Sequence, residues 1–309
     1  MSDLFSTTVM IGILASGIRL ATPYLYASIG EVFGQKRGVL NLGIEGQMLL
    51  GAFAAFYVAL TTGNLWLGVL VAMIVGAVMG LAMAFVTVNL RAQQGISGIG
   101  FYLFGMGMSD LLFQKLLGTV ETVKGFPKIF IPGLSDIPGV GEIFFSQNLL
   151  VYIAYLLVPI AWFVLNKTTL GLKIRSVGEN PDAADSLGVS VARIRYFTII
   201  LGGILSAVAG ASLSIALLNV FQQNMTSGLG FIAVALVYFG AWKPAGVLGG
   251  ALLFSMINSL QLWIQVLGIP IPSDIAVMMP YVLTILVLVA AVSRVRAPSA
   301  LTKPFERED

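Results

Sequence analysis

The chain contains no cysteine and no histidine. Their absence excludes disulfides and thiol chemistry, and it removes the usual transition-metal ligands and the commonest general base. The sequence also lacks the GxxxxGK[ST] pattern of a P-loop, so the chain does not by itself cradle a nucleoside triphosphate. No pair of acidic residues has a spacing that indicates a catalytic carboxylate dyad. We therefore expect a protein that catalyses no reaction and binds no metal.

Charge is scarce as well. Only 10% of the 309 residues are charged, against about 25% in an ordinary soluble domain. Hydrophobic residues make up 58% of the chain, and the mean hydropathy is +0.95. Alternating ten-residue strand patterns are absent, which disfavours a β-barrel. The composition indicates an all-α, polytopic integral membrane protein.

Most of the chain divides into apolar segments of about 20 residues, the length that crosses a hydrocarbon core of about 30 Å. The expected spans are residues 9–29, 41–60, 65–88, 96–118, 148–166, 195–220, 246–266 and 275–293. A shorter apolar piece at 229–241 is interpreted as a broken or tilted helix. The prediction is a single transmembrane domain over residues 1–309, a bundle of about eight to ten transmembrane helices.

Basic residues fall in alternate connections between these spans, which the positive-inside rule assigns to the cytoplasm. They are Lys36, Arg37, Arg91, Lys167, Lys173, Arg175, Arg193, Arg195, Lys243, Arg294, Arg296, Lys303 and Arg307. This scheme predicts a cytoplasmic loop over residues 167–194 and a cytoplasmic tail over residues 294–309. The polar, proline-rich segment 119–147 is expected to be an external loop. The N-terminus lies outside if the short piece crosses the membrane.

Small residues recur at every fourth position in several spans. Such rows let helix backbones approach closely. Tight packing within one bundle is favoured over a dedicated dimer face. The rows are Gly202, Ser206, Gly210 and Ser214; Gly76, Gly80 and Ala84; and Gly43, Gln47, Gly51 and Ala55.

The cytoplasmic loop contains the stretch LGLKIRSVGENPDAADSLGVSVARIRY, residues 170–196. Asn180 suits an N-cap, Pro181 the first helical position and Gly188 the residue after the helix, so a two-turn helix is predicted. A helix this short is marginal alone in water. Its small apolar side, Ala183, Ala184 and Leu187, packs either on its own bundle or in a groove of a cytoplasmic partner, and we favour the partner.

Three stretches carry a family resemblance. GEVFGQKRGVLNLGIEGQMLLGAFAAF (30–56) closely resembles the permeases of ATP-binding-cassette importers for branched-chain amino acids and simple sugars, and especially their nucleoside-type members. GENPDAADSLGVSV resembles that family's contact with its ATPase subunit, and ALVYFGAWKPAGVLGGALLF (235–254) resembles its late G-x-W-x-P segment. The resemblance covers residues from about 17 to about 266.

The resemblance implies a type II-like permease that works as a pair of related or identical permeases. Its partners would be two cytoplasmic ATPases and an extracytoplasmic solute-binding protein, in the bacterial cytoplasmic membrane. ATP and Mg would then be bound by the ATPase partners, and this chain would bind no cofactor. The residues implied in coupling to the ATPase are Glu179, Asn180, Pro181, Ala183, Ala184, Leu187 and Gly188.

A carboxylate interrupts the apolar stretch GVLNLGIEGQMLL, residues 38–50. Counted from Arg37 along a helix, Glu45 lies about 12 Å deep, where an ionised side chain costs at least about 2.5–3.5 kcal/mol. Three interpretations stay open: Glu45 lines a hydrated pathway, it forms a buried pair or caps a broken helix, or it lies shallower than this count. Arg19 and Asp110 raise the same question, and either is able to pair with Glu45 or to reach an interface.

Amides beside aromatic rings suit a ligand with a flat base and hydroxyl groups, although a sugar would use the same residue types. The candidate substrate-pathway residues are Asn41, Glu45, Gln47, Ser97, Phe101, Tyr102, Asn219, Phe221, Asn224, Asn258 and Gln261. Each also has an ordinary role in helix packing or interfacial anchoring.

The function that fits these features is ATP-driven import of nucleosides, with a simple sugar or a riboflavin-like solute as alternatives within the class. The alternative from another class is an ion- or proton-coupled secondary transporter that uses Glu45, Arg19 and Asp110 and works without an ATPase.

Overall fold

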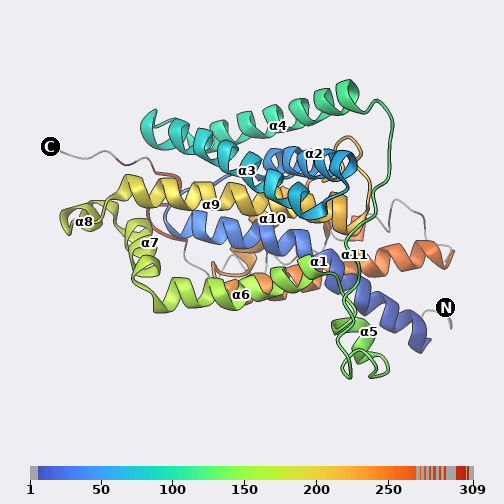
Figure 1. Ribbon diagram of the computed structural model, residues 1–309. Helices are drawn as coiled ribbons and strands as arrows, with labels where there is room; N and C mark the ends of the chain where they lie inside the picture. Colours follow the sequence, from blue (N-terminus) through green and yellow to red (C-terminus); the bar gives the residue numbers. More distant parts are fainter. Residues whose placement is uncertain are drawn as a thin grey trace.

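The chain forms a bundle of helices (Figure 1). The structure, a computed structural model, describes residues 6–268 and 297–303 continuously, single residues or pairs between 272 and 289, and residue 305. The helices are α1 Thr7–Lys36, α2 Ile44–Thr62, α3 Leu65–Ala84, α4 Gln94–Leu116, α5 Val140–Phe144, α6 Leu149–Lys167, α7 Thr169–Glu179, α8 Pro181–Ser186, α9 Val191–Ser212, α10 Leu229–Phe239 and α11 Pro244–Val266. Two π-helical turns, η2 Phe85–Asn89 and η3 Leu213–Leu217, extend α3 and α9.

Seven of the described helices are long and apolar enough to cross a membrane: α1, α2, α3 with η2, α4, α6, α9 with η3, and α11. This confirms the prediction of an all-α polytopic bundle. The short apolar piece is α10, whose 11 residues extend about 16 Å and thus cross about half of a hydrocarbon core. The expected span at 275–293 lies largely outside the described residues.

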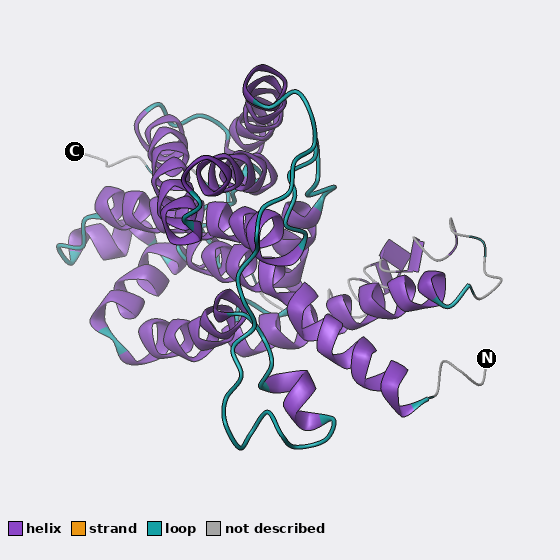
Figure 2. Ribbon diagram, turned by 45° about the vertical axis from the view of Figure 1, so that its right-hand side comes forward, coloured by secondary structure: helices purple, strands orange, loops and turns teal. Residues whose placement is uncertain are grey.

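The long helix α1 is the centre of the bundle. It packs against α6, α9, α10 and α11, while α2 and α3 pack on another side of α9 and α4 covers α2. In Figures 1 and 2 α4 accordingly lies at one edge of the bundle and α6 at the opposite edge. The connection between α4 and α6 contains only α5 as a helix.

The rows of small residues lie at helix–helix contacts inside this bundle. A Cβ atom at Gly76 of α3 would collide with the carbonyl oxygen of Gly203 in α9, and one at Gly51 of α2 would collide with Ala207. α9 is therefore in backbone contact with α2 and α3, which is the within-bundle packing that the sequence favours.

Candidate transport pathway and coupling segment

The connection from α1 to α2 is not helical, although the sequence predicts a span that begins at residue 41. Gly38 turns the chain with a φ of 94°, a conformation that favours glycine. Buried side chains then accept the backbone N–H groups. Leu40 N donates to Gln94 Oε1 (2.9 Å), and Asn41 N donates to Glu31 Oε1 (3.1 Å). These bonds satisfy donors that burial would otherwise leave unpaired, so the chain enters the bundle without forming a helix.

The amides of Asn41 and Gln47 turn toward each other. Asn41 Nδ2 donates to Gln47 Oε1 (3.1 Å), and Asn41 Oδ1 accepts from Gly43 N (2.9 Å). Both side chains are buried. The structure thus places these two candidate pathway residues inside the bundle, where they close the turn before α2.

Glu45 links the start of α2 to the start of α10. Its Oε1 accepts from Thr226 Oγ1 (2.6 Å) and from Gly228 N (2.7 Å), and its Oε2 accepts from Gly230 N (2.6 Å). These donors form the N-terminal end of α10, where backbone N–H groups lack helical partners and the helix dipole favours a negative charge. Glu45 is therefore the cap of a half-helix that lies more than 180 residues away in the chain.

This contact selects among the three interpretations of Glu45. The side chain is only 1% exposed, and α10 separates it by about 16 Å from the level of Trp242. Among the described residues the Glu45 carboxylate forms no ion pair with Arg19 and no hydrogen bond with Asp110, and its hydrogen-bond partners are all at the start of α10. The geometry is that of a carboxylate capping a broken helix.

The chain that leads into α10 exposes uncharged amides. Segment 218–228 contains no helix, and its residues Gln222, Gln223 and Asn224 are all exposed. This segment runs from the end of η3, where Val220 is bridged to Thr122 of the connection after α4, to Thr226 and Gly228, which donate to Glu45. Lipid tails cannot satisfy exposed amides or an irregular backbone. This face of the bundle therefore borders water or another protein subunit.

Two aromatic rings lie beside the same end of α10. Tyr102 of α4 meets Phe231 of α10 edge to face, with 5.3 Å between ring centroids. α4 approaches this point because Gly46 has no side chain: a Cβ there would collide with the backbone of Phe101 and Tyr102. Phe231 is 39% exposed, so the pair offers an accessible aromatic edge next to the amides.

The other candidate residues are dispersed. Ser97 is half-buried on α4, and Asn219 lies against Gly125 in the connection that follows α4. Phe221 is fully buried among Phe53, Phe56 and Phe113, so it belongs to the core. Asn258 and Gln261 lie on α11, half-buried and buried respectively. Of the amide and aromatic candidates, Asn224 and Tyr102 are those that gather near the cap of α10.

Sequence reasoning missed Gln222, Gln223, Thr226 and Phe231. A signal was available: an uncharged polar run, FQQNMTS, separates an expected span from an apolar piece that is too short to cross. Such a run is typical of the irregular half of a discontinuous helix. Thr226 had no signal of its own, because its role depends on a partner in α2.

The predicted two-turn helix in the cytoplasmic loop is α8. Asn180 is its N-cap and accepts from Ala183 N (3.0 Å), Pro181 occupies the first turn, and Gly188 follows the helix with a φ of 82°. Asn180 also ends α7, so one residue closes one helix and opens the next.

The faces of α8 differ from the prediction. Ala184 is only 3% exposed and packs in the core of its own chain, whereas Leu187 is 85% exposed and Ala183 is also exposed. Ala184 therefore does not share an outer surface with the other two residues. The prediction that the three form one docking side is wrong, because the capped turn points Ala184 back toward the bundle.

α7 and α8 are fastened to the end of α1 by the chain's own tail. Ala300 N donates to the carbonyl oxygen of Gly178 (2.9 Å), and Thr302 N donates to that of Gly38 (3.0 Å). Ser299 Oγ adds a bond to Glu179 Oε2 (3.1 Å). A Cβ at Gly178 would collide with the backbone of α1, so α7 rests directly on the last turn of that helix.

A second set of contacts leads from this turn to the far end of α10. Glu31 accepts from Gln35 Nε2 (2.9 Å), and Gln35 Oε1 accepts from Trp242 Nε1 (2.8 Å). Trp242 and Ala241 have φ angles of 55° and 52°, in the left-handed region, within the G-x-W-x-P segment that follows α10. α10 is thus held by Glu45 at one end and by Trp242 at the other.

Comparison with known proteins agrees with this architecture. Residues 13–288 match the family described as branched-chain amino acid transport system / permease component. A guanosine ABC transporter permease protein of Bacillus subtilis, NupQ, is 38% identical over 92% of this chain and 93% of its own length. A nucleoside ABC transporter permease protein of Lactococcus lactis, NupC, is 38% identical over 93% and 94%. No solved structure matches the chain.

A protein of Haloferax volcanii, provisionally named as a glucose ABC transporter permease protein, TsgC13, is also 38% identical, over 96% of this chain and 98% of its own length. In each of these three organisms a second permease protein matches at lower identity, between 25% and 28%. The family match covers most of the sequence, and with the seven apolar helices it establishes a multi-pass protein of the cytoplasmic membrane. The chain belongs to the branched-chain amino acid transport system permease family of ABC transporters.

Proposed function

We propose that the chain is the permease subunit of a nucleoside importer, and that the solute passes the face formed by the N-terminal end of α10. The observation that carries this proposal is the exposure of Gln222, Gln223 and Asn224 in the segment that leads into α10, whose first turn carries the Tyr102–Phe231 pair. Amides bond ribose hydroxyls and base edges, and an aromatic edge contacts a flat base. Two of the similar proteins are named for guanosine or nucleosides and one, equally identical, for glucose, so the aromatic pair beside the amides is what favours the nucleoside.

The driving force is ATP hydrolysis on separate subunits. The family is one of ABC transport permeases, which supports this mechanism and not the ion-coupled alternative. We infer that Leu187 inserts into a groove of a cytoplasmic ATPase, because a leucine that is 85% exposed at the tip of a capped helix gains about 1.5–3 kcal/mol when a partner buries it. ATP and Mg would be bound by that subunit, and this chain would perform no catalysis.

The second permease is proposed to be a paralogue rather than a copy. In each of three organisms, one permease protein is 38% identical to this chain and a second permease protein is 25–28% identical to it. Two related chains would enclose the pathway between them, with this chain contributing the α10 face. An extracytoplasmic solute-binding protein would deliver the nucleoside.

The solute is tested by uptake into proteoliposomes that contain this chain with its co-purified permease, ATPases and binding protein. Radiolabelled guanosine, glucose and a branched-chain amino acid are supplied in parallel, with ATP, without ATP, and with a proton gradient alone. We expect guanosine uptake that requires ATP. Glucose uptake without guanosine uptake would reject the nucleoside assignment but keep the permease assignment, and uptake driven by the gradient alone would reject both.

The coupling role is tested with Leu187→Arg. The variant should insert and fold normally, since the side chain is exposed, but it should lose most ATP-dependent uptake and release the ATPases during purification. Leu187→Met is the matched control and should retain both. Full uptake by Leu187→Arg would refute docking through this residue.

A further inference from the structure

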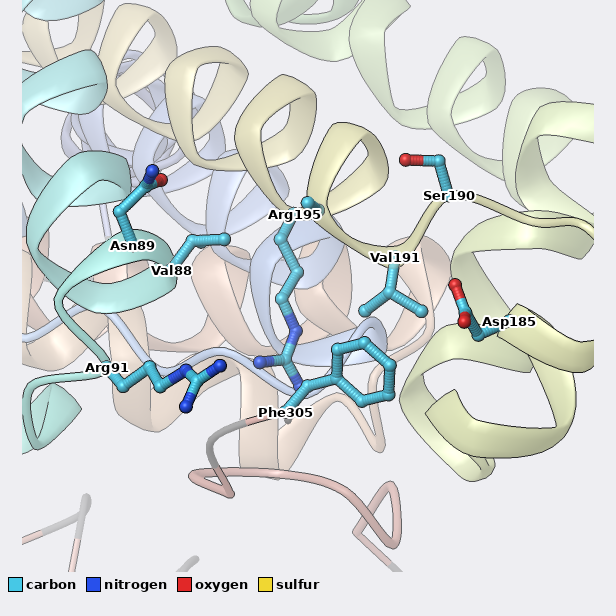
Figure 3. A pocket seen from close by; sticks show the side chains of 9 residues that line it. Val88, Asn89, Arg91, Asp185, Ser190, Val191, Arg195 and Phe305 are labelled. Carbon is cyan, nitrogen blue, oxygen red and sulfur yellow. The ribbon is translucent and has the colours of Figure 1, made fainter. Parts of the chain in front are cut away.

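Asp110 is an ionisable side chain within a membrane span, unlike the charges at the ends of the bundle. Arg91, for example, follows the span that ends at Asn89 and borders a polar pocket of about 380 Å³ with Arg195 and Phe305 (Figure 3). Asp110 instead lies on α4, six residues or about 9 Å before the end of that helix. Charged groups within spans almost always face a protein interior or a water-filled cavity, and they mark solute pathways.

The carboxylate of Asp110 lacks a partner. Its Oδ1 atom is buried and accepts no hydrogen bond from any residue that the structure describes. The side chain as a whole is half-buried, so part of the carboxylate stays accessible. A buried acceptor without a donor is unfavourable, and more so when it carries a charge. This indicates that a group outside the described residues supplies the donor.

Two ring contacts place Asp110 beside the segment that leads into α10. Tyr102 meets Phe231, and Phe113 meets Phe221 with 5.6 Å between ring centroids. One side of α4 therefore runs along the chain from Phe221 to Phe231. Asp110 follows Tyr102 by eight residues and precedes Phe113 by three, which puts it within about 80° of both around the helix axis. It thus lies on the side of α4 that borders this segment.

The exposed residues of that segment are uncharged, so they do not neutralise Asp110. Gln222, Gln223 and Asn224 each carry an amide that both donates and accepts hydrogen bonds. An ionised carboxylate only accepts, and its two oxygens suit two donors that lie side by side. A nucleoside offers such pairs: the 2′- and 3′-hydroxyls of ribose, and on guanine the N1–H with the 2-amino group.

We propose that Asp110 is a specificity-determining residue of the pathway, and that its carboxylate accepts two adjacent hydrogen-bond donors of the passing nucleoside. The inference rests on the proposed function, and it adds a charged acceptor to the amides and the aromatic pair. Both donor pairs have the same chemistry, and solute analogues distinguish them. A solute that lacks the pair leaves the carboxylate unsatisfied as it passes, and a site of this kind discriminates strongly against such a solute.

The test compares solutes in proteoliposomes that contain the complete transporter with its binding protein and ATP. The solutes are guanosine, inosine, which lacks the 2-amino group, and 2′,3′-dideoxyguanosine, which lacks both hydroxyls. Asp110→Asn keeps the size of the side chain but removes the charge and one acceptor. The same binding protein is used throughout, so its own selectivity cancels when the uptake ratio of guanosine to each analogue is compared between parent and variant.

We expect Asp110→Asn to lower one of these ratios about tenfold or more, because the variant no longer favours the solute that carries both donors. A fall in the guanosine-to-inosine ratio assigns the contact to the base, and a fall in the guanosine-to-dideoxyguanosine ratio assigns it to the ribose. Glu121→Gln, at an exposed acidic position in the connection after α4, is the matched control and should leave both ratios at the parent's values.

Other outcomes would overturn the proposal. Unchanged ratios in Asp110→Asn, or an equal loss of uptake for all three solutes, would show that the carboxylate does not select the solute. Release of the second permease from the variant during purification, with both ratios unchanged, would assign the carboxylate to the contact between the permeases instead. Failure of the proposed function is distinct: the parent itself would then take up no guanosine with ATP, and the role of Asp110 would be rejected with it.

Discussion

Replacing Glu45 by glutamine removes the charge and one acceptor while keeping the size of the side chain. In the parent protein both carboxylate oxygens accept hydrogen bonds: Oε1 from Thr226 and Gly228, and Oε2 from Gly230. In Glu45→Gln one of these positions becomes an NH2 group that faces a donor. If the amide oxygen stays with Thr226 and Gly228, the N–H of Gly230 loses its acceptor.

The magnitude follows from these contacts. A buried donor left without a partner costs about 1–3 kcal/mol, and a hydrogen bond to a charged group contributes about 1.5–3 kcal/mol against about 1 for a neutral one. The loss of favourable charge at the N-terminus of α10 adds about 0.3–1 kcal/mol. We expect Glu45→Gln to destabilise the bundle by about 2–4 kcal/mol, with the effect concentrated on α10.

The measurement is thermal unfolding of the complete transporter in nanodiscs, followed by hydrogen exchange of the α10 peptide. Glu142→Gln, at an exposed position on α5, is the matched control and should behave as the parent does. Glu45→Asp should fall between, since it keeps the charge but is one methylene shorter. A Glu45→Gln variant with the parent's unfolding temperature and unchanged exchange in α10 would refute the capping argument.

Three further predictions concern other contacts. Gly178→Ala should lower the unfolding temperature, because the added methyl group collides with the carbonyl oxygen of Lys36 and forces α7 away from α1; the readout is a thermal melt. Trp242→Phe removes the indole donor and leaves the buried Gln35 Oε1 unpaired, so it should cost about 1–3 kcal/mol, measured in the same way. Gln223→Ala should raise KM for guanosine by up to about tenfold while basal ATPase activity stays unchanged, because the side chain is exposed and holds no helix in place.

Much of the fold could be predicted because its causes are local. A hydrocarbon core demands long apolar helices, so the spans follow from hydropathy, and α8 follows from the capping preferences of Asn180, Pro181 and Gly188. The start of α2 was predicted three residues too early, since hydropathy does not record that Glu31 and Gln94 accept the N–H groups of the preceding turn.

The site was harder to predict because its contacts are distant in the chain. The partners of Glu45 lie more than 180 residues further along, and no periodicity connects the two segments. The orientation of Ala184 had the same difficulty: adjacent apolar positions on a six-residue helix do not reveal which one the rest of the bundle covers. Gln222 and Gln223 can be read in the sequence, but only the structure shows that their exposed amides precede a half-helix.

The contacts at the two ends of α10 link the proposed coupling and transport sites. Its N-terminal end is held by Glu45 and adjoins the exposed amides, and its C-terminal end is held through Trp242 and Gln35 to the last turn of α1, on which α7 rests. A displacement of α7 and α8 by an ATPase would therefore reach the solute face as a movement of one short rigid helix, because 11 hydrogen-bonded residues bend less readily than the irregular segments on either side.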